Sequence, residues 1–213
     1  MKNFLKSLFF ICLAVSVTFA SNIPAGAVAA LEQFSKNAAI EGNFKQVKHI
    51  KKISRNFEAT GSFLIANGTG VVWNTEKPFK TSMIITEKQM VQRSASGAVS
   101  KMDASENAIF AEFSKTIQSV FSGNVKSLEE HFTVSAEAVK NTGWKLTLVP
   151  KEKAIRQVIA SIELNLSSLD KNVAQLTSVL ILDGDGNTLT YEFTNQKPSA
   201  TLTSEQKKAF EGI

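Results

Sequence analysis

The sequence has 213 residues, enough for one domain with a substantial core. It contains 24 lysine and arginine residues against 19 aspartate and glutamate residues, a formal net charge of +5. So small an excess does not indicate nucleic acid as a partner. The single cysteine, Cys12, excludes an intramolecular disulfide.

The first twenty residues are organised like a secretory signal peptide. Two lysines form a basic start, residues 8–19 are almost entirely apolar, and Thr18 and Ala20 are the small residues that a signal peptidase recognises. The apolar run is too short for a stable membrane span. We therefore predict cleavage after Ala20, which leaves an exported, soluble single domain of residues 21–213. Without Cys12, this domain would have no thiolate metal site, no cysteine nucleophile and no disulfide partner.

The mature chain is predicted to begin with an amphipathic helix at residues 24–39. Its apolar residues, which include Leu31 and Phe34, recur at helical spacing. From Gly42 onwards the apolar period shifts toward two, which indicates strands. Three strands are predicted here, at residues 56–65, 70–73 and 81–86. In the first of them, one face would carry Phe57, Ala59, Gly61, Phe63 and Ile65.

A second helical region is predicted at residues 105–124. Phe110, Phe113 and Ile117 fall on one apolar stripe of this helix. A shorter helix should follow at residues 125–132. The two helices interrupt the strands and are therefore candidates to cover a sheet.

Strands return in the last third of the chain, before a short helix that starts after Thr203. They are predicted at residues 144–149, 160–166, 175–182 and 188–193. In the first of them, Trp144, Leu146 and Leu148 lie on one side. The order of helix, strands, helices and strands predicts an α+β fold, in which an antiparallel sheet has helical segments over one face.

The stretch at residues 183–187, Asp-Gly-Asp-Gly-Asn, looks like the front of a calcium loop. An EF-hand loop needs a glycine at its sixth position and a bidentate glutamate at its twelfth, where this sequence has Thr188 and Thr194. The flanks alternate like strands, and Asp-Gly and Gly-Asn favour a tight turn. We therefore predict a β-hairpin here and no metal.

The sequence contains no recognisable constellation of catalytic residues. His49 and His131 are the only histidines, and neither has a second ligand at metal-binding spacing. The Gly-x-Ser-x-Gly and His-Glu-x-x-His patterns are absent. We therefore expect a protein that is not an enzyme and that uses no cofactor.

The densest charge feature is a basic cluster around residue 50. It consists of Lys45, Lys48, Lys51, Lys52 and Arg55, with His49 among them. A solvated hairpin would explain it. The functional alternative is a docking patch for an acidic partner or for anionic lipid headgroups.

Several short motifs follow one another between residues 31 and 195. They are Phe44-Lys45-Gln46 at the first strand, Gly61, Trp73 and Pro78 in the next strand pair, Leu-Thr-Leu-Val-Pro-Lys at residues 146–151, and the hairpin at residues 180–193. In this order and spacing the chain resembles the LolA-like periplasmic carriers of outer-membrane lipoproteins, as a divergent member. The resemblance covers nearly the whole mature domain.

The resemblance implies an incomplete, strongly curved antiparallel β-barrel, with helices that form a lid over an apolar cavity. It implies a periplasmic carrier that binds the acyl chains of a lipoprotein or another lipid and takes them from the inner toward the outer membrane. Its partners would be this cargo, an inner-membrane releasing transporter or exporter, and an outer-membrane acceptor. The alternative is a non-carrier envelope module of the same fold, such as a stress sensor, that acts through protein contacts.

Large apolar residues on the interior-facing side of each element would line the cavity. They are Leu31, Phe34, Phe44, Phe63, Ile65, Val71, Trp73, Met83, Ile85, Phe110, Phe113, Ile117, Trp144, Leu146, Leu148, Ile162, Leu164, Tyr191 and Phe193. The same pattern also fits a packed core, because periodicity does not distinguish a core from a cavity.

One position departs from the family pattern at the lid. In the family, an arginine before a proline links the sheet to the helical lid and gates release; by spacing it falls on Asn67, which precedes Gly68. Asparagine is shorter and uncharged. We therefore expect a lid that opens more easily, or one that is held by apolar contacts from Phe110 and Phe113 alone.

Overall fold

The computed structural model describes residues 23–107, 110–111, 114, 119–120, 123–140, 143–167 and 174–211. The predicted signal peptide lies outside these residues, and so do Phe113 and Ile117 of the predicted lid. The elements in chain order are α1 (Ala25–Ser35), β1 (Ala39–Ile50), η1 (Lys51–Ile53), β2 (Arg55–Ala66), β3 (Gly70–Lys77), β4 (Thr81–Thr86), β5 (Gln89–Arg93), β6 (Val99–Asp103), α3 (Val125–His131), β7 (Phe132–Val139), β8 (Gly143–Pro150), α4 (Lys153–Val158), β9 (Ile159–Ser167), β10 (Leu176–Asp183), β11 (Thr188–Ser199) and α5 (Ser204–Ala209).

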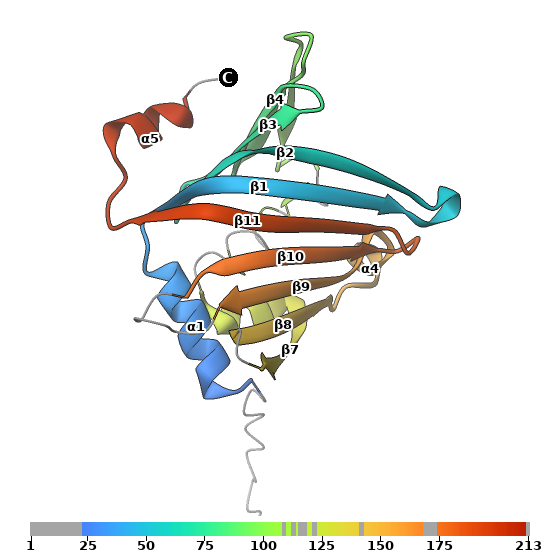
Figure 1. Cartoon of the computed structure of the whole chain (residues 1–213), viewed down its shortest axis with the longest axis vertical. Coiled ribbons are helices and arrows are strands. Elements are labelled where there is room, and N and C mark those ends of the chain that lie inside the picture. Colours follow the sequence, from blue (N-terminus) through green and yellow to red (C-terminus); the bar gives the residue numbers. More distant parts are fainter. Residues whose placement is uncertain are drawn as a thin grey trace, which may run out of the picture.

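The strands of the described residues form one antiparallel sheet. Their order is β6-β5-β4-β3-β2-β1-β11-β10-β9-β8-β7, so that β6 and β7 are the outer edges. Figure 1 shows how the sheet curls around the helices without closing. The predicted α+β fold with an incomplete, strongly curved antiparallel barrel is therefore confirmed.

The predicted first and last helices are present. α1 ends at Ser35, four residues before the predicted end at residue 39, because Ala39 already pairs with both β2 and β11. α5 starts after Thr203, whose hydroxyl accepts a hydrogen bond from the N–H of Gln206. The Gln206 side chain accepts one from the N–H of Thr203, which completes a capping box.

The Asp-Gly-Asp-Gly-Asn stretch is a hairpin turn between β10 and β11, as predicted. One carboxylate oxygen of Asp183 accepts hydrogen bonds from the N–H groups of Asp185 (2.9 Å) and Asn187 (2.8 Å). The other accepts from Nδ2 of Asn187, at 2.8 Å. Burial raises the pKa of Asp183, but these hydrogen bonds outweigh it and leave the pKa below its usual value. Gly186, at φ +81°, supplies the left-handed backbone that the turn needs.

Five elements were not predicted from the sequence: η1, β5, β6, β7 and α4. β6 is exposed throughout, and Val91 of β5 and Phe132 of β7 are the buried residues of their strands. Edge strands of this kind are defined by backbone pairing rather than by burial, so their apolar alternation is weak. α4 has only six residues, too few for a clear helical period.

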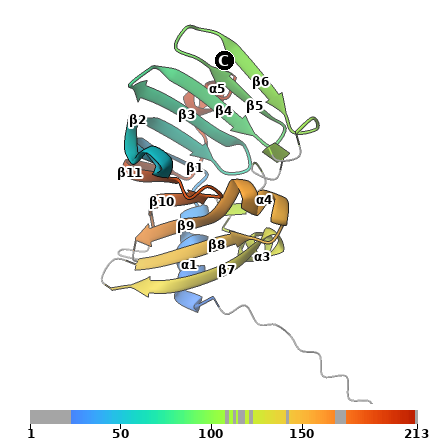
Figure 2. The same ribbon diagram turned by 90° about the vertical axis from the view of Figure 1, so that its right-hand side faces the viewer.

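The two faces of the sheet carry separate apolar clusters. The larger one fills the concave face, beneath α1 and α3 (Figure 2). The smaller one lies on the other face, where Leu64, Val72 and Ile84 pack against Leu202 and Phe210 around α5. Within the described residues, no helix has the length and apolar character needed to span a bilayer.

Candidate lipid-binding interior

Five aromatic side chains meet at the centre of the concave face. They come from β1, β2, β3 and β11 and are Phe44, Phe63, Trp73, Tyr191 and Phe193. The ring centroids of Phe44 and Trp73 are 4.0 Å apart and stacked, and Tyr191 meets Trp73 edge-on at 5.1 Å. Phe63 and Phe193 also meet edge-on, at 5.1 Å. Such pairs contribute more than their buried area alone.

Strand register explains why these rings meet. Phe44 of β1 lies between Phe193 of β11 and Gly61 of β2, and Phe63 of β2 lies beside Trp73 of β3. Gly61 leaves room for the Phe44 ring, because a Cβ at this position would lie 2.8 Å from Phe44 Cε1. A glycine in mid-strand therefore permits the stacking of Phe44 on Trp73.

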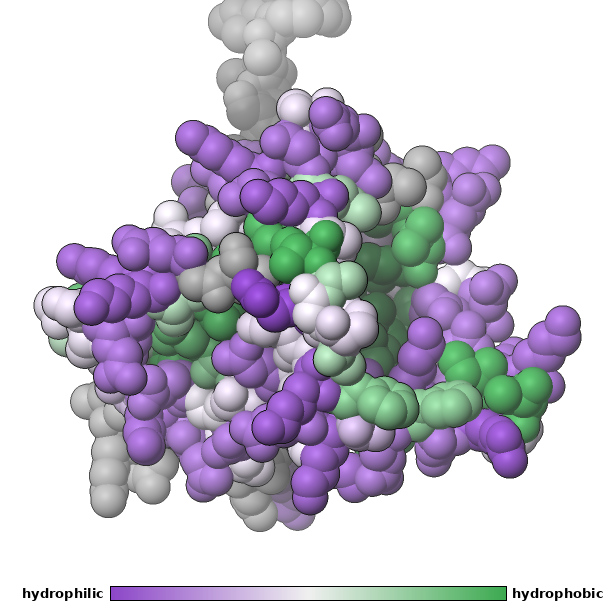
Figure 3. Space-filling view, turned by 90° about the horizontal axis from the view of Figure 1, so that it is seen from above, coloured by the Kyte–Doolittle hydropathy of each residue, from purple (hydrophilic) through white to green (hydrophobic). Residues whose placement is uncertain are grey.

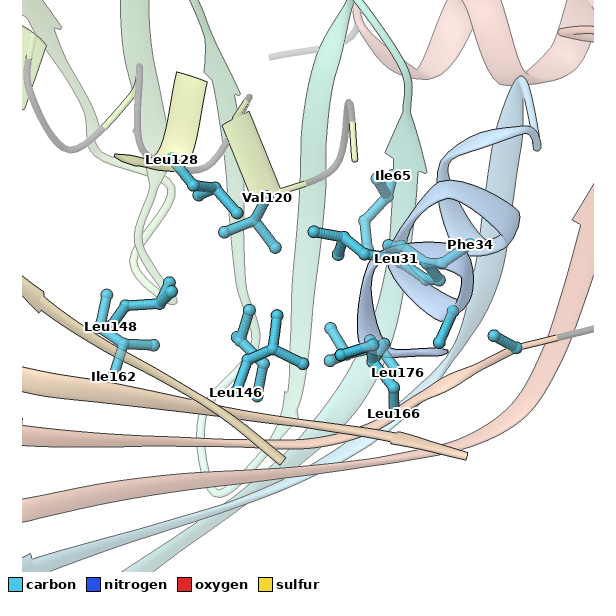
Figure 4. Packing of buried hydrophobic residues seen from close by; sticks show 14 of the residues in the cluster. Leu31, Phe34, Ile65, Val120, Leu128, Leu146, Leu148, Ile162, Leu166 and Leu176 are labelled. Atoms are coloured by element: carbon cyan, nitrogen blue, oxygen red, sulfur yellow. The ribbon is translucent and has the colours of Figure 1, made fainter. Parts of the chain in front are cut away.

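Aliphatic side chains form the other half of the interior. Leu146 and Leu148 of β8 and Leu164 of β9 are fully buried. Figure 4 shows Leu146 on the strand side of the interior and Leu31 of α1 on the helix side. Leu128 of α3 closes the same space from the side of the helices (Figure 4). The concave face is thus covered by apolar side chains from both halves of the sheet and from the helices α1 and α3.

Most of the predicted cavity residues lie in this one cluster. It holds Leu31, Phe34, Phe44, Phe63, Ile65, Val71, Trp73, Trp144, Leu146, Leu148, Ile162, Leu164, Tyr191 and Phe193. Ile85 and Phe110 are buried and Met83 is half-buried, but the cluster does not include them.

Sequence reasoning missed several members of the interior. Leu166 continues the alternation of Ile162 and Leu164, and it pairs with Leu176 of β10. Leu166 could therefore have been found from its strand period. Leu128 could not, because nothing in a short isolated helix tells which face packs on a sheet.

Tyr191 places a hydroxyl in this apolar interior. Burial raises the pKa of Tyr191 to about 12, because the phenolate would be poorly solvated there. In the described part of the chain, no side-chain oxygen or nitrogen is both buried and unpaired. The hydroxyl has no hydrogen-bond partner among those residues, so its oxygen is not completely enclosed by them.

Asn67 joins the sheet to the end of α1. It lies in the turn between β2 and β3, where its Nδ2 donates to the carbonyl oxygen of Ser35 at 3.0 Å. Its backbone N–H donates to the carbonyl oxygen of Ala38, also at 3.0 Å. We expected only apolar contacts, from Phe110 and Phe113, to hold the lid. The two bonds of Asn67 are polar and go to the end of α1 instead. The side chain is exposed, so one such bond is worth little.

The basic cluster of the sequence lies on the hairpin of β1 and β2, with Lys45 along β1 and the other cations near the turn. Lys45 pairs with Glu58, with 3.3 Å between Nζ and Oε2. Lys48, Lys51, Lys52 and Arg55 are exposed at the far end of the hairpin. Nδ1 of His49 is 2.7 Å from Oδ1 of Asn56, within hydrogen-bond distance.

A further hollow lies on the opposite face of the sheet, between α5 and strands β1 to β3. Its volume is about 1120 Å³, and its lining includes Glu41, Asn43, Asn74 and Glu205. Figure 3 looks down on the side of the molecule that carries α5 and shows apolar recesses bordered by polar side chains. Apolar side chains, among them Leu64, Val72 and Ala209, share this lining with the polar groups.

Comparison with known proteins decides the family. Residues 35–209 match the model of the family described as outer membrane lipoprotein carrier protein LolA. The chain belongs to the LolA family. The match spans α5 and every strand of the sheet, and it begins at the last residue of α1. None of the curated protein sequences matches the chain.

One solved structure shows the same fold at low sequence identity, and two others are similar with lower scores. A DUF1329 family protein from Desulfovibrio piger is 11% identical, with a TM-score of 0.54 over 88% of this chain and 96% of that one. A LolA superfamily protein from Nitrosomonas europaea is 8% identical, with a TM-score of 0.45 over 85% and 97%. The Pseudomonas aeruginosa MucA/MucB complex gives 13% identity and a TM-score of 0.46 over 85% of this chain and 60% of that one.

Proposed function

We propose that this protein is a periplasmic carrier that binds the acyl chains of a lipoprotein or another lipid in its concave interior. It would receive this cargo from an inner-membrane transporter or exporter and deliver it to an outer-membrane acceptor. The observation that carries the proposal is the larger apolar cluster, between the concave face of the sheet and the helices α1 and α3, in a member of the lipoprotein-carrier family.

The chemistry of the interior suits a chain that must be bound and then released. Exposure of an acyl chain to water costs about 0.8 kcal/mol per CH₂ group, so a carrier has to offset much of this cost. Rings and aliphatic side chains do so without directional bonds. The Tyr191 hydroxyl is a polar group that could bind the ester or amide next to the chain.

The helix α1 is well suited to act as a movable cover. Its buried face carries Ala27 and Ala30 beside Leu31 and Phe34, so half of this face contributes little apolar area. If cargo displaced α1, the sheet would lose its modest contacts with this helix and gain contacts with the acyl chain of the cargo. The rings of Phe44 and Trp73 would become the floor of the opened space.

Uptake of a fluorescent fatty-acyl probe by the purified protein tests this function. Trp73→Ala should weaken probe retention, because it removes the ring that contacts all four other aromatic side chains. Leu64→Ala is the matched control, since Leu64 is buried in the cluster on the opposite face. It should lower the melting temperature and leave retention unchanged.

Native mass spectrometry of protein taken from the periplasm supplies the second test. A carrier should be purified with bound lipid or take up the probe. Protein that carries no lipid and takes up no probe would refute the proposal and favour a non-carrier envelope module, whose stacked rings would form an ordinary core.

A further inference from the structure

Exposed apolar side chains gather at one end of the sheet. The turns after β1, β3, β5 and β10 all lie at this end, because consecutive antiparallel strands reverse direction. α4 lies there too, opposite α1 and α5 (Figures 1 and 2). Seven large apolar residues are exposed in the described chain, and those at this end are Ile53, Phe57, Phe79, Val99 and Val158.

The hairpin of β1 and β2 combines such residues with unpaired cations. We call residues 48–57 the basic tip. Ile53 is 54% exposed and Phe57 is 52% exposed. The cations of the tip are Lys48, Lys51, Lys52 and Arg55, and none of them has an ion-pair partner in the part of the chain that the structure describes.

Neighbouring elements hold the basic tip in place. The N–H of Lys51 donates to Oδ1 of Asn187 at 3.0 Å, and Asp183 orients the Asn187 side chain through its Nδ2. Ser54, at φ +47°, closes the turn. The turn between β10 and β11 packs closely against α4. Gly184 is so near Gln157 that an added Cβ would overlap the carbonyl group of Gln157. The tip is therefore a supported projection.

We propose that the basic tip docks onto an anionic phospholipid surface. Ile53 and Phe57 would enter the interface between headgroups and acyl chains, and the four cations would contact the phosphates. Lysine and arginine suit this position, because their stems can lie along apolar groups while the charges reach the headgroups.

The shape of the basic tip favours a membrane over an acidic protein. A specific protein interface needs about 800 Å² of complementary surface on each partner. The tip is a narrow turn with two apolar side chains, which is far less. Two protruding apolar residues surrounded by positive charge match the layered chemistry of a bilayer surface.

Docking in this way would bring the carrier's interior to the membrane. Phe57 lies on the same face of β2 as Gly61 and Phe63, because side chains alternate along a strand. The exposed ring thus continues the row that leads to the aromatic centre. The sequence had placed Phe57 on this row. The structure adds that Phe57 is exposed, because the helices do not cover this end of the strand. The proposal does not depend on what the interior binds.

Flotation of the purified protein with lipid vesicles tests the proposal. Vesicles of phosphatidylcholine alone are compared with vesicles that also contain phosphatidylglycerol, at low and at high salt. The protein should float with the anionic vesicles only, and less so at high salt. Lys51→Glu with Lys52→Glu should weaken binding about tenfold or more, given about fivefold for each cation near such a surface. Ile53→Ser with Phe57→Ser should weaken it by a similar factor.

The control changes the same chemistry at the other end of the sheet. Val139→Ser with Lys140→Glu alters an exposed apolar residue and an exposed cation there, and should leave flotation unchanged. Melting curves show whether each variant is folded. Three results would overturn the proposal: no flotation of the wild-type protein, which would favour an acidic protein partner; equal losses in the control; or a loss in the charge variant without one in the apolar variant, which would show that Ile53 and Phe57 do not enter the membrane. Acyl-probe uptake is measured without vesicles, so either proposal can fail alone.

Discussion

The replacement Gly61→Ala tests the register on which the aromatic centre depends. A Cβ at this position would lie 2.8 Å from Phe44 Cε1 and 2.9 Å from the carbonyl carbon of Asn74, and still closer to the Asn74 oxygen. Ordinary van der Waals contacts of a Cβ begin at 3.4 Å. The ring could turn aside, but the Asn74 carbonyl belongs to the backbone of β3 and cannot move without disturbing the pairing of β2 with β3.

The size of the effect follows from this overlap. Overpacking in a well-packed region costs about 1–3 kcal/mol, and a clash with backbone belongs at the upper end, so we expect a loss of about 3 kcal/mol. For a domain of this size, about 2–4 °C of melting temperature is lost per kcal/mol, so Gly61→Ala should melt about 6–12 °C lower.

Thermal unfolding followed by circular dichroism measures this change. Gly97→Ala is the control, because Gly97 has φ +86° and no atom lies within 4 Å of the place that an added Cβ would take. Its cost is the left-handed backbone alone, about 1 kcal/mol. Equal losses in the two variants would refute the register of β2 against β3 and the explanation of the Phe44–Trp73 stack.

Three further predictions concern the turns at the two ends of the sheet. The lowered pKa of Asp183 means that its carboxylate stabilises the fold above the ordinary pKa of 3.8 and that this contribution is lost as the pH falls below it; the difference in melting temperature between wild type and Asp183→Ala should therefore shrink in acid. Calcium should not raise the melting temperature, because Asp183 already binds its own turn and no bidentate glutamate follows; a rise abolished by Asp185→Ala would contradict the hairpin assignment. Asn67→Ala removes an exposed hydrogen bond to Ser35 and should cost about 0.5 kcal/mol with little change in probe release; a change as large as that of Trp73→Ala would make Asn67 a gate in its own right.

The sequence by itself determined the local elements and their sidedness. The period of two in residues 56–65 and 144–149 was enough to place Phe63 and Leu146 on the interior face, because alternation is a property of the backbone. The Asp-Gly-Asp-Gly-Asn turn was equally local, since its bonds join residues at most four apart. The family resemblance then supplied the curvature of the sheet.

Only the tertiary structure decided which separate segments meet. The aromatic centre depends on the pairing of β1 with β11, which brings together residues that are about 150 positions apart, and no local period encodes such a pairing. The edge strands β6 and β7, and β5 next to β6, also escaped prediction, because the partner strand rather than their own burial defines them. In the sequence, Phe57 falls on the apolar face of its strand; it is exposed because the hairpin extends past the helices that cover the rest of the sheet.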